Sequence, residues 1–187
     1  MAWPGSAPAA PDIRVALSDE PVRAARLRIE GRYTVTLPGD SRILHQGTDL
    51  PVTTVEVTPQ GLRLGTLKFA ATRVEIRAEK DPAIWVDDHQ YRGRVRFLRA
   101  DPKRFRAVNV VPVETYLASV VDSEMPRDFG REARAAQAVA ARTYAYMSIR
   151  DARTTAGETA SARDWDLFAS VRSQKYLGVR YKDGTGA

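Results

Sequence analysis

The hydrophobic pattern of this chain changes its period near residue 109. Before that point, short segments such as 13–17, 27–30 and 73–77 alternate apolar and polar residues, which is typical of half-buried strands. After it, apolar residues over 113–121 recur at the three- and four-residue spacing of an amphipathic helix. The pattern therefore predicts an α+β protein in which strands come first and helices follow.

Turn residues between the short strands predict a small sandwich or barrel-like lobe over residues 13–108. Residues 1–12 are rich in Ala and Pro and are expected to form a flexible leader. This leader lacks the basic and apolar regions of a signal peptide, and no run in the chain approaches the roughly 20 apolar residues of a transmembrane helix. Residues 109–187 are expected to form a helical segment that carries the chemistry.

Two helices are expected in this segment. Pro112 suits the first turn of one helix, which should end before Pro126 because the residue before a proline is disfavoured from helical geometry. The second helix should run from about 131 to 150. One of its faces holds Ala133, Ala136, Ala140, Tyr144 and Met147. The small residues on this face would allow another element to approach closely, and the small, polar residues 151–163 predict a loop.

The positive charge of the chain is concentrated in one segment. The net charge is +6, and residues 92–106 alone contain seven Lys and Arg against one acidic residue. Such a segment favours an anionic partner, either nucleic acid, anionic lipid or an acidic cell-wall polymer. The alternative is a solvated strand face with no partner.

Glu124 has an unusual position among the carboxylates. It stands at the end of the first predicted helix, close to Pro126. The negative end of the helix dipole disfavours the ionised form, and partial burial by Val120 and Met125 would act in the same direction. A carboxyl that keeps its proton is what a general acid at neutral pH requires. On composition alone, a single Glu after a helix is most often a plain surface residue.

Several blocks of sequence resemble the SpoIID/LytB family in content and order. Residues 111–117 read VPVETYL, residues 123–126 read SEMP and residues 136–145 read AQAVAARTYA. Downstream, residues 173–178 read SQKYLG and resemble the second block of the family. The strong part of the resemblance covers about 91–178.

The resemblance implies an extracytoplasmic lytic transglycosylase that acts on peptidoglycan. The catalytic acid of the family is the Glu of its Glu-Met-Pro motif, which corresponds to Glu124 here. This residue would protonate the glycosidic oxygen between N-acetylmuramic acid and N-acetylglucosamine. It would then take the proton of the muramyl C6 hydroxyl, which closes on C1 to give a 1,6-anhydro sugar. A second carboxylate is not required because water is not the nucleophile.

Two other functions remain open from the sequence. LytB-type members imply a non-catalytic cell-wall-binding module that activates an N-acetylmuramoyl-L-alanine amidase. A more distant alternative is a nucleic-acid-binding β domain that uses Arg92, Arg94 and Arg96, but it leaves the motif around Glu124 unexplained. We therefore expect peptidoglycan glycan strands as the partner, an amidase as the alternative partner, and no nucleic acid.

The family blocks also supply candidate substrate-binding residues. They are Gln137, Arg142, Tyr144, Ser173, Gln174 and Tyr176. Gln137 and Arg142 would either bind the glycan or only brace the turn at Glu124. Tyr144, with Tyr116 and Trp165, would either stack on sugar rings or pack in the core. The acids nearest to Glu124 in sequence are expected to have turn and N-cap roles, and they are Asp122 and Asp128.

The chain departs from the family in two places. Some sporulation members bind zinc near the second block through Cys and His, whereas Phe168, Arg172 and Ser173 stand at the corresponding positions here. None of these is a usual zinc ligand and the chain has no cysteine, so we predict no metal and no cofactor, with packing by Phe168 in place of the ion. Family members also continue beyond the second block, so we expect the domain to be truncated at Ala187.

Overall fold

The computed structural model describes residues 10–81, 83–126, 128–158 and 163–181. Within these ranges, 12 strands form one sheet, and two helices, α1 (Val113–Glu124) and α2 (Arg131–Glu158), follow strand 10. The strands are β1 (Asp12–Ala16), β2 (Ala24–Thr36), β3 (Ile43–Thr58), β4 (Gly61–Leu64), β5 (Leu67–Phe69), β6 (Arg73–Ala78), β7 (Ile84–Val86), β8 (His89–Tyr91), β9 (Arg94–Arg99), β10 (Phe105–Pro112), β11 (Leu167–Phe168) and β12 (Arg180–Tyr181). The α+β class is confirmed. Residues 1–9 of the predicted leader lie outside the described residues. The last residue of that leader, Asp12, is the first residue of β1.

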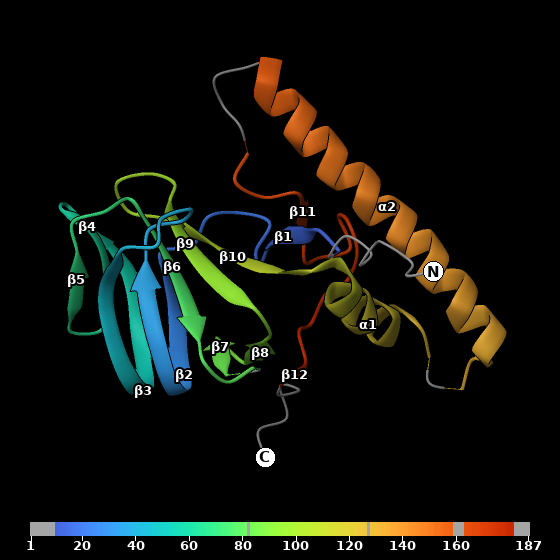
Figure 1. Ribbon diagram of the computed structural model, residues 1–187, viewed down its shortest axis with the longest axis horizontal. Coiled ribbons are helices and arrows are strands. Elements are labelled where there is room, and N and C mark those ends of the chain that lie inside the picture. Colours follow the sequence, from blue (N-terminus) through green and yellow to red (C-terminus); the bar gives the residue numbers. More distant parts are fainter. Residues whose placement is uncertain (1–9, 82, 127, 159–162, 182–187) are drawn as a thin grey trace, which may run out of the picture.

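The sheet runs in the order β11-β1-β10-β9-β6-β2-β3-β4-β5, while β7 pairs with β2 and β8, and β8 pairs with β12. All these pairs are antiparallel except that between β1 and β11. Figure 1 shows most strands at one end of the molecule and the helices at the other, joined by β10. Because β11 and β12 follow α2 in sequence, the segment after the helices belongs to the sheet. The prediction of a separate sandwich or barrel-like lobe is therefore not confirmed.

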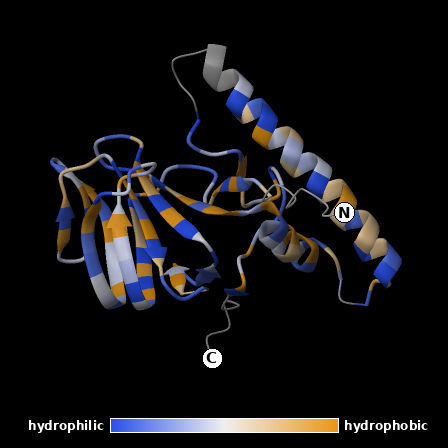
Figure 2. Cartoon of the chain, in the orientation of Figure 1, coloured by the Kyte–Doolittle hydropathy of each residue, from blue (hydrophilic) through white to orange (hydrophobic). Residues whose placement is uncertain are grey.

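Strand β2 contains the predicted segment 27–30 and continues beyond it to Thr36. Its alternation, visible in Figure 2, buries Leu27, Ile29 and Val35 in the core. Gly31 follows residues 27–30 with a φ of 78°, and the pairing with β3 shifts its register there. A glycine adopts this left-handed backbone without strain, so the strand bends and continues.

The chain bends at Gly93, between β8 and β9. This residue has a φ of 75°, and a Cβ there would lie 2.4 Å from the carbonyl oxygen of Val110. Only glycine allows β10 to approach the chain so closely at this backbone angle. Arg92 therefore lies in a bend, apart from Arg94 and Arg96 on β9.

Helix α1 agrees with the prediction. Its buried residues recur at helical spacing and cover the sheet, and they are Val113, Tyr116, Leu117, Val120 and Val121. Pro112 occupies the N-cap, one residue before the first turn where we expected it. At the other end Met125 is extended, with a φ of −105°, because Pro126 follows it.

Helix α2 differs from the prediction in length and in orientation. It continues to Glu158, so the loop expected from 151 is wrong at least over 151–158. Its buried face contains Ala141, Ala145, Ile149 and Ala152. The face that we expected to pack is exposed instead along its whole length, from Ala133 to Met147. The alanines of α2 occur on all of its faces, so the sequence alone does not distinguish one face from another.

Neither of the helices seen in the described ranges is long and apolar enough to cross a membrane.

Candidate functional site

Glu124 is the last residue of α1, at the point where the chain turns towards α2. Its side chain is exposed, so the expected partial burial by Val120 and Met125 is wrong. The Val120 side chain is itself buried in the core, and Met125 has an extended backbone after the end of α1. The carboxylate can therefore be reached from solvent.

Two hydrogen bonds hold the Glu124 carboxylate, one on each oxygen. Gln137 on α2 donates through Nε2 to Oε2 at 2.8 Å. The backbone N–H of Lys175 donates to Oε1 at 2.9 Å. Glu124 forms no ion pair with any residue that the structure describes. The three sequence blocks that carry Glu124, Gln137 and Lys175 thus meet at one carboxylate.

The block that carries Lys175 is anchored by buried side chains. Tyr116 donates from its hydroxyl to Oε1 of Gln174 at 2.8 Å, and the hydroxyl of Tyr176 donates to Oδ1 of Asn109 at 2.7 Å. The rings of Tyr116 and Tyr176 lie 5.1 Å apart, and burial raises the pKa of both phenols well above the usual value. Tyr116 therefore packs in the core. A contact of Gln174 or Tyr176 with substrate stays a prediction, because both side chains are already bonded within the fold.

Arg142 forms a bidentate ion pair with Glu114 between α2 and α1. Its Nε and terminal nitrogen donate to the two carboxylate oxygens at 3.0 and 2.7 Å. These hydrogen bonds from Arg142 hold the pKa of Glu114 below its usual range. Arg142 thus joins the two helices, and its contact with a glycan stays a prediction.

Tyr144 and Ser173 line a cavity of about 230 Å³ between α2 and the segment before the second block. Ser173 accepts a hydrogen bond through Oγ from the backbone N–H of Phe168 at 3.2 Å. The guanidinium of Arg172 lies 4.4 Å from the centre of the Phe168 ring. The three positions where some family members bind zinc thus contact one another. Among the residues described, no group of three or more His, Asp or Glu side chains could hold a metal ion.

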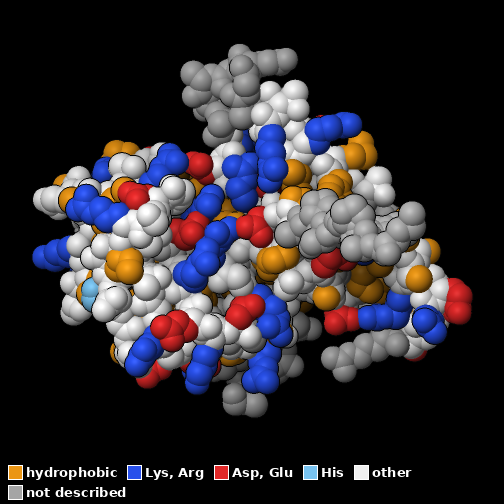
Figure 3. All heavy atoms as spheres, viewed as in Figure 1, with side chains coloured by type: hydrophobic (Ala, Val, Ile, Leu, Met, Phe, Trp, Pro, Cys, Tyr) orange, Lys and Arg blue, Asp and Glu red, His pale blue; other side chains and the backbone are white. Residues whose placement is uncertain are grey.

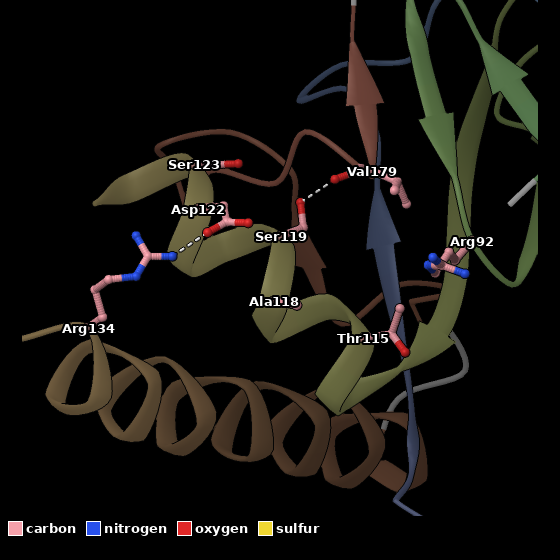
Figure 4. A pocket seen from close by; sticks show the side chains of 9 residues that line it. Arg92, Thr115, Ala118, Ser119, Asp122, Ser123, Arg134 and Val179 are labelled. Atoms are coloured by element: carbon pink, nitrogen blue, oxygen red, sulfur yellow. Dashed lines mark hydrogen bonds and ion pairs between the residues drawn. The ribbon is translucent and has the colours of Figure 1, made fainter. Parts of the chain in front are cut away.

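A larger cavity, of about 590 Å³, lies beside α1, on a side of the helix that does not include Glu124. Figure 4 shows Thr115, Ser119 and Asp122 on one side of α1. Ser119 donates to the carbonyl oxygen of Gly178 at 2.7 Å, and Asp122 forms an ion pair with Arg134. Asp122 precedes Glu124 by two residues, so their side chains point about 200° apart around the helix. Glu124 accordingly does not line this cavity.

Our sequence reasoning missed this second cavity. The available signal was the polar spacing of Thr115, Ser119 and Asp122, four and then three residues apart. Asp122 lies in the last turn of α1, so the expected turn or N-cap role is wrong for it. Asp128 does lie in the turn between the helices.

Acidic residues pair with the basic segment 92–106, three of them from elsewhere in the fold and one, Asp101, from the segment itself. The pairs are Arg92–Asp81, Arg94–Asp12, Arg96–Glu75 and Arg104–Asp101. Figure 3 shows Lys and Arg side chains beside Asp and Glu side chains on the face of the molecule in view. Arg106 is buried with its guanidinium 4.4 Å from the centre of the Trp165 ring. The net charge counted along the segment therefore overstates the charge that this part of the fold presents to a partner.

A comparison with protein families identifies the part of the chain that carries this site. Residues 101–186 match the family model described as Stage II sporulation protein, SpoIID. Neither the curated proteins nor the solved structures contain a match to the chain. The family match covers both helices and the second block, and it supports a function related to the cell wall. The resemblance seen in the sequence blocks is confirmed by this match of residues 101–186 to the SpoIID family model.

Proposed function

We propose that this chain cleaves peptidoglycan glycan strands by lytic transglycosylation, with Glu124 as the general acid and then the general base. The observation that carries the proposal is the Glu124 carboxylate itself. The carboxylate lies at the surface, where a polymer can reach it. Each of its oxygens accepts a hydrogen bond from a different sequence block. An oriented and accessible carboxylate is the group that this reaction needs.

The proposed reaction uses one carboxyl group and balances without water. A proton on Glu124 passes to the oxygen between muramyl C1 and the N-acetylglucosamine residue, and the C1–O bond breaks. The muramyl C6 hydroxyl attacks C1, and its proton returns to Glu124 as the 1,6-anhydro ring closes. Each carboxylate oxygen accepts one hydrogen bond in the fold and keeps another lone-pair position for this proton.

The face of α2 that holds Gln137 supplies a path for the strand. Gln137, Tyr144 and Ser148 recur at seven- and four-residue spacing and share this face, and Tyr144 lies about 10 Å along the axis from Gln137. Tyr144 is exposed and lines the cavity of about 230 Å³ with Ser148 and Ser173. An exposed aromatic ring beside hydroxyl groups suits a sugar ring. We propose that the glycan runs from Glu124 along α2 into this cavity, and that the protein works outside the cytoplasm, where this substrate lies.

One observation favours the alternative of a non-catalytic amidase activator. The outer face of α2 exposes large apolar side chains, including Val139 at 61% and Met147 at 49% of their accessible area. Exposed apolar groups of this kind are what a protein-binding surface requires. This alternative predicts binding to cell walls without cleavage by the chain itself.

A digest of purified peptidoglycan separates the two functions. Intact and peptide-stripped strands would be incubated with wild type, Glu124→Gln and, as a matched control, Glu132→Gln at an exposed position of α2. We expect 1,6-anhydro-muramyl products by mass spectrometry from wild type and the control only. Wall binding without products from any of the three proteins would contradict the proposal, and stimulation of an added amidase would then support the activator.

A further inference from the structure

We propose that Asn109, Tyr116, Gln174 and Tyr176 are positioning residues that hold the Lys175 backbone N–H against Glu124. The inference rests on the proposed function, because it assigns these residues to the orientation of the carboxylate that reacts. None of the four needs to touch the glycan. Their common feature is that they are buried and hydrogen-bonded around a donor that is itself at the surface.

The burial pattern of the second block changes sharply around Lys175. Gln174 and Tyr176 are 7% and 3% exposed, whereas the Lys175 side chain points into solvent. The backbone N–H of Tyr176 also donates to the carbonyl oxygen of Ala169 at 3.0 Å. The two residues next to Lys175, Gln174 and Tyr176, are therefore held in place and fix its backbone, although its side chain is exposed.

The first anchor of this segment is Asn109 on β10. Its side chain is fully buried, and Nδ2 donates to the carbonyl oxygens of Arg92 and Arg94 at 2.8 and 2.9 Å. Both amide hydrogens are thereby used, which leaves Oδ1 to accept from the hydroxyl of Tyr176. The sheet thus determines the orientation of Asn109, and Asn109 determines where Tyr176 lies.

The second anchor is Tyr116 on α1. Its hydroxyl donates to Gln174, the residue before Lys175. Tyr116 precedes Glu124 by eight residues on the same helix, about 12 Å along the axis. Helix α1 therefore carries the Glu124 carboxylate and also holds the segment whose Lys175 N–H donates to it. The donor and the acceptor are thus both positioned by the same helix.

A backbone donor differs from the other donor at Glu124. Gln137 can change its side-chain rotamer, whereas the N–H of Lys175 moves only if its chain segment moves. The anchors hold that segment, so Oε1 of Glu124 keeps one orientation while Oε2 can follow a substrate. Small displacements of a reacting group are costly, and about 1 Å can reduce a rate by roughly 100-fold.

The first test measures position and needs no substrate. In a ¹H–¹⁵N spectrum of wild type, the Lys175 amide should shift with pH as Glu124 titrates, and this response should vanish in Glu124→Gln. Tyr176→Phe, which removes the bond to Asn109, should reduce the response by at least about half, because the Lys175 N–H would no longer be held 2.9 Å from the carboxylate. Tyr33→Phe is the matched control, because this buried tyrosine contacts His45 far from the site.

The second test measures turnover on peptidoglycan. Tyr176→Phe should lower kcat by about 10-fold with KM within about twofold, while Tyr33→Phe changes neither. Tyr116→Phe, which removes the other anchor, should act in the same direction and gives an independent result if Tyr176→Phe folds poorly. A Lys175 response unchanged in both anchor variants overturns the inference. Absence of activity in wild type instead contradicts the proposed function, and the spectra still decide the positioning role.

Discussion

Two glutamates of this chain, Glu75 and Glu124, are held in opposite ways. Glu75 on β6 is buried and lies between two guanidinium groups of β9, with Arg96 Nε at 2.7 Å and Arg94 Nε at 3.6 Å. Glu124 is exposed and receives two neutral amide donors. The first carboxylate is neutralised by cations, and the second is oriented without being neutralised. A charged group that the fold leaves oriented and uncompensated is available for chemistry.

The difference follows from where each residue stands in the fold. Glu75 faces Arg96 in the register between β6 and β9, and a carboxylate buried in a sheet requires an opposite charge. Glu124 stands at the end of α1, which Pro126 terminates, and its side chain is exposed to solvent. Substitution of each residue should therefore have a different consequence.

The largest effect is expected on the activity of Glu124→Gln. The amide keeps the size of the side chain but can neither donate nor accept the transferred proton, so the initial rate of anhydro-muramyl formation should fall by at least about 100-fold. The free energy of unfolding should change by less than about 1 kcal/mol because the group is exposed. Rates and urea unfolding measured on the same preparations check both statements. A variant that keeps its rate would place the reaction on another group.

The next largest effect is expected on the stability of Glu75→Gln. Removal of this carboxylate leaves Arg94 and Arg96 partly buried without it, which should cost about 3 kcal/mol in the free energy of unfolding. Activity per folded molecule should stay within about twofold of wild type.

The matched control for this comparison is Glu56→Gln on β3. Glu56 pairs with Arg63 at a more exposed position of the sheet, so its loss should cost less than about 1 kcal/mol. Urea unfolding at neutral pH measures all three proteins. Equal costs for Glu75→Gln and Glu56→Gln would show that burial between the two arginines of β9 adds nothing.

The sequence predicted the order of elements and the end of α1 because local rules decide both. Alternation of apolar and polar residues indicates strands, and a proline such as Pro126 disfavours helical geometry in the residue before it. It did not predict Asp12, Glu75 and Asp81 as partners of the arginines in 92–106, because those acids are distant in the sequence. Glu75 meets Arg96 only through the antiparallel register of β6 and β9, and Asp81 meets Arg92 only at the bend around Gly93.

The candidate site divides in a similar way between local and distant information. The motif identified Glu124, and the same blocks pointed to Gln137, which contacts it. The backbone donor of Lys175 could not be read from residue types, because a backbone N–H leaves no mark in a sequence. The buried face of α2 was also hidden, since the surrounding alanines make its faces alike and only the contact with α1 and β11 distinguishes them.

A further contrast with the two glutamates comes from Tyr116 and Tyr176, which are buried and carry no charge at neutral pH. Burial raises the pKa of Tyr116 and Tyr176 above that of an unfolded tyrosine, near 10. Above about pH 10 the unfolded chain loses these protons while the folded chain keeps them, so the free energy of unfolding falls by about 1.4 kcal/mol per pH unit for each group.

Urea unfolding of wild type and Tyr116→Phe between pH 9 and pH 11 checks this dependence. The variant should lose stability less steeply than wild type above pH 10, and the two slopes should agree below it. Identical slopes over the whole range would mean that Tyr116 ionises in the folded chain as readily as in the unfolded one.

Glu114 lies between the two extremes, since it is exposed like Glu124 and paired with an arginine like Glu75. The hydrogen bonds from Arg142 lower the pKa of Glu114, so the pair stabilises the fold above the usual glutamate range and loses this effect as the pH falls through the lowered value. Because solvent screens an exposed pair, Glu114→Gln should lower Tm at pH 7 by only about 1 °C, and the difference from wild type should shrink at pH 3.5.

The same variant decides what Arg142 does at the site. If Arg142 only braces the helices, Arg142→Lys and Glu114→Gln should have equal and small effects on Tm and leave KM for glycan strands unchanged. If Arg142 also binds the strand, Arg142→Lys should raise KM by a few-fold, because lysine cannot reproduce the planar fork of the guanidinium. Glu114→Gln should then leave KM unchanged or lower it, since it releases the guanidinium for the substrate. A rise in KM in both variants would mean instead that the pair orients Arg142 for binding, and an exposed ion pair would then belong to the site.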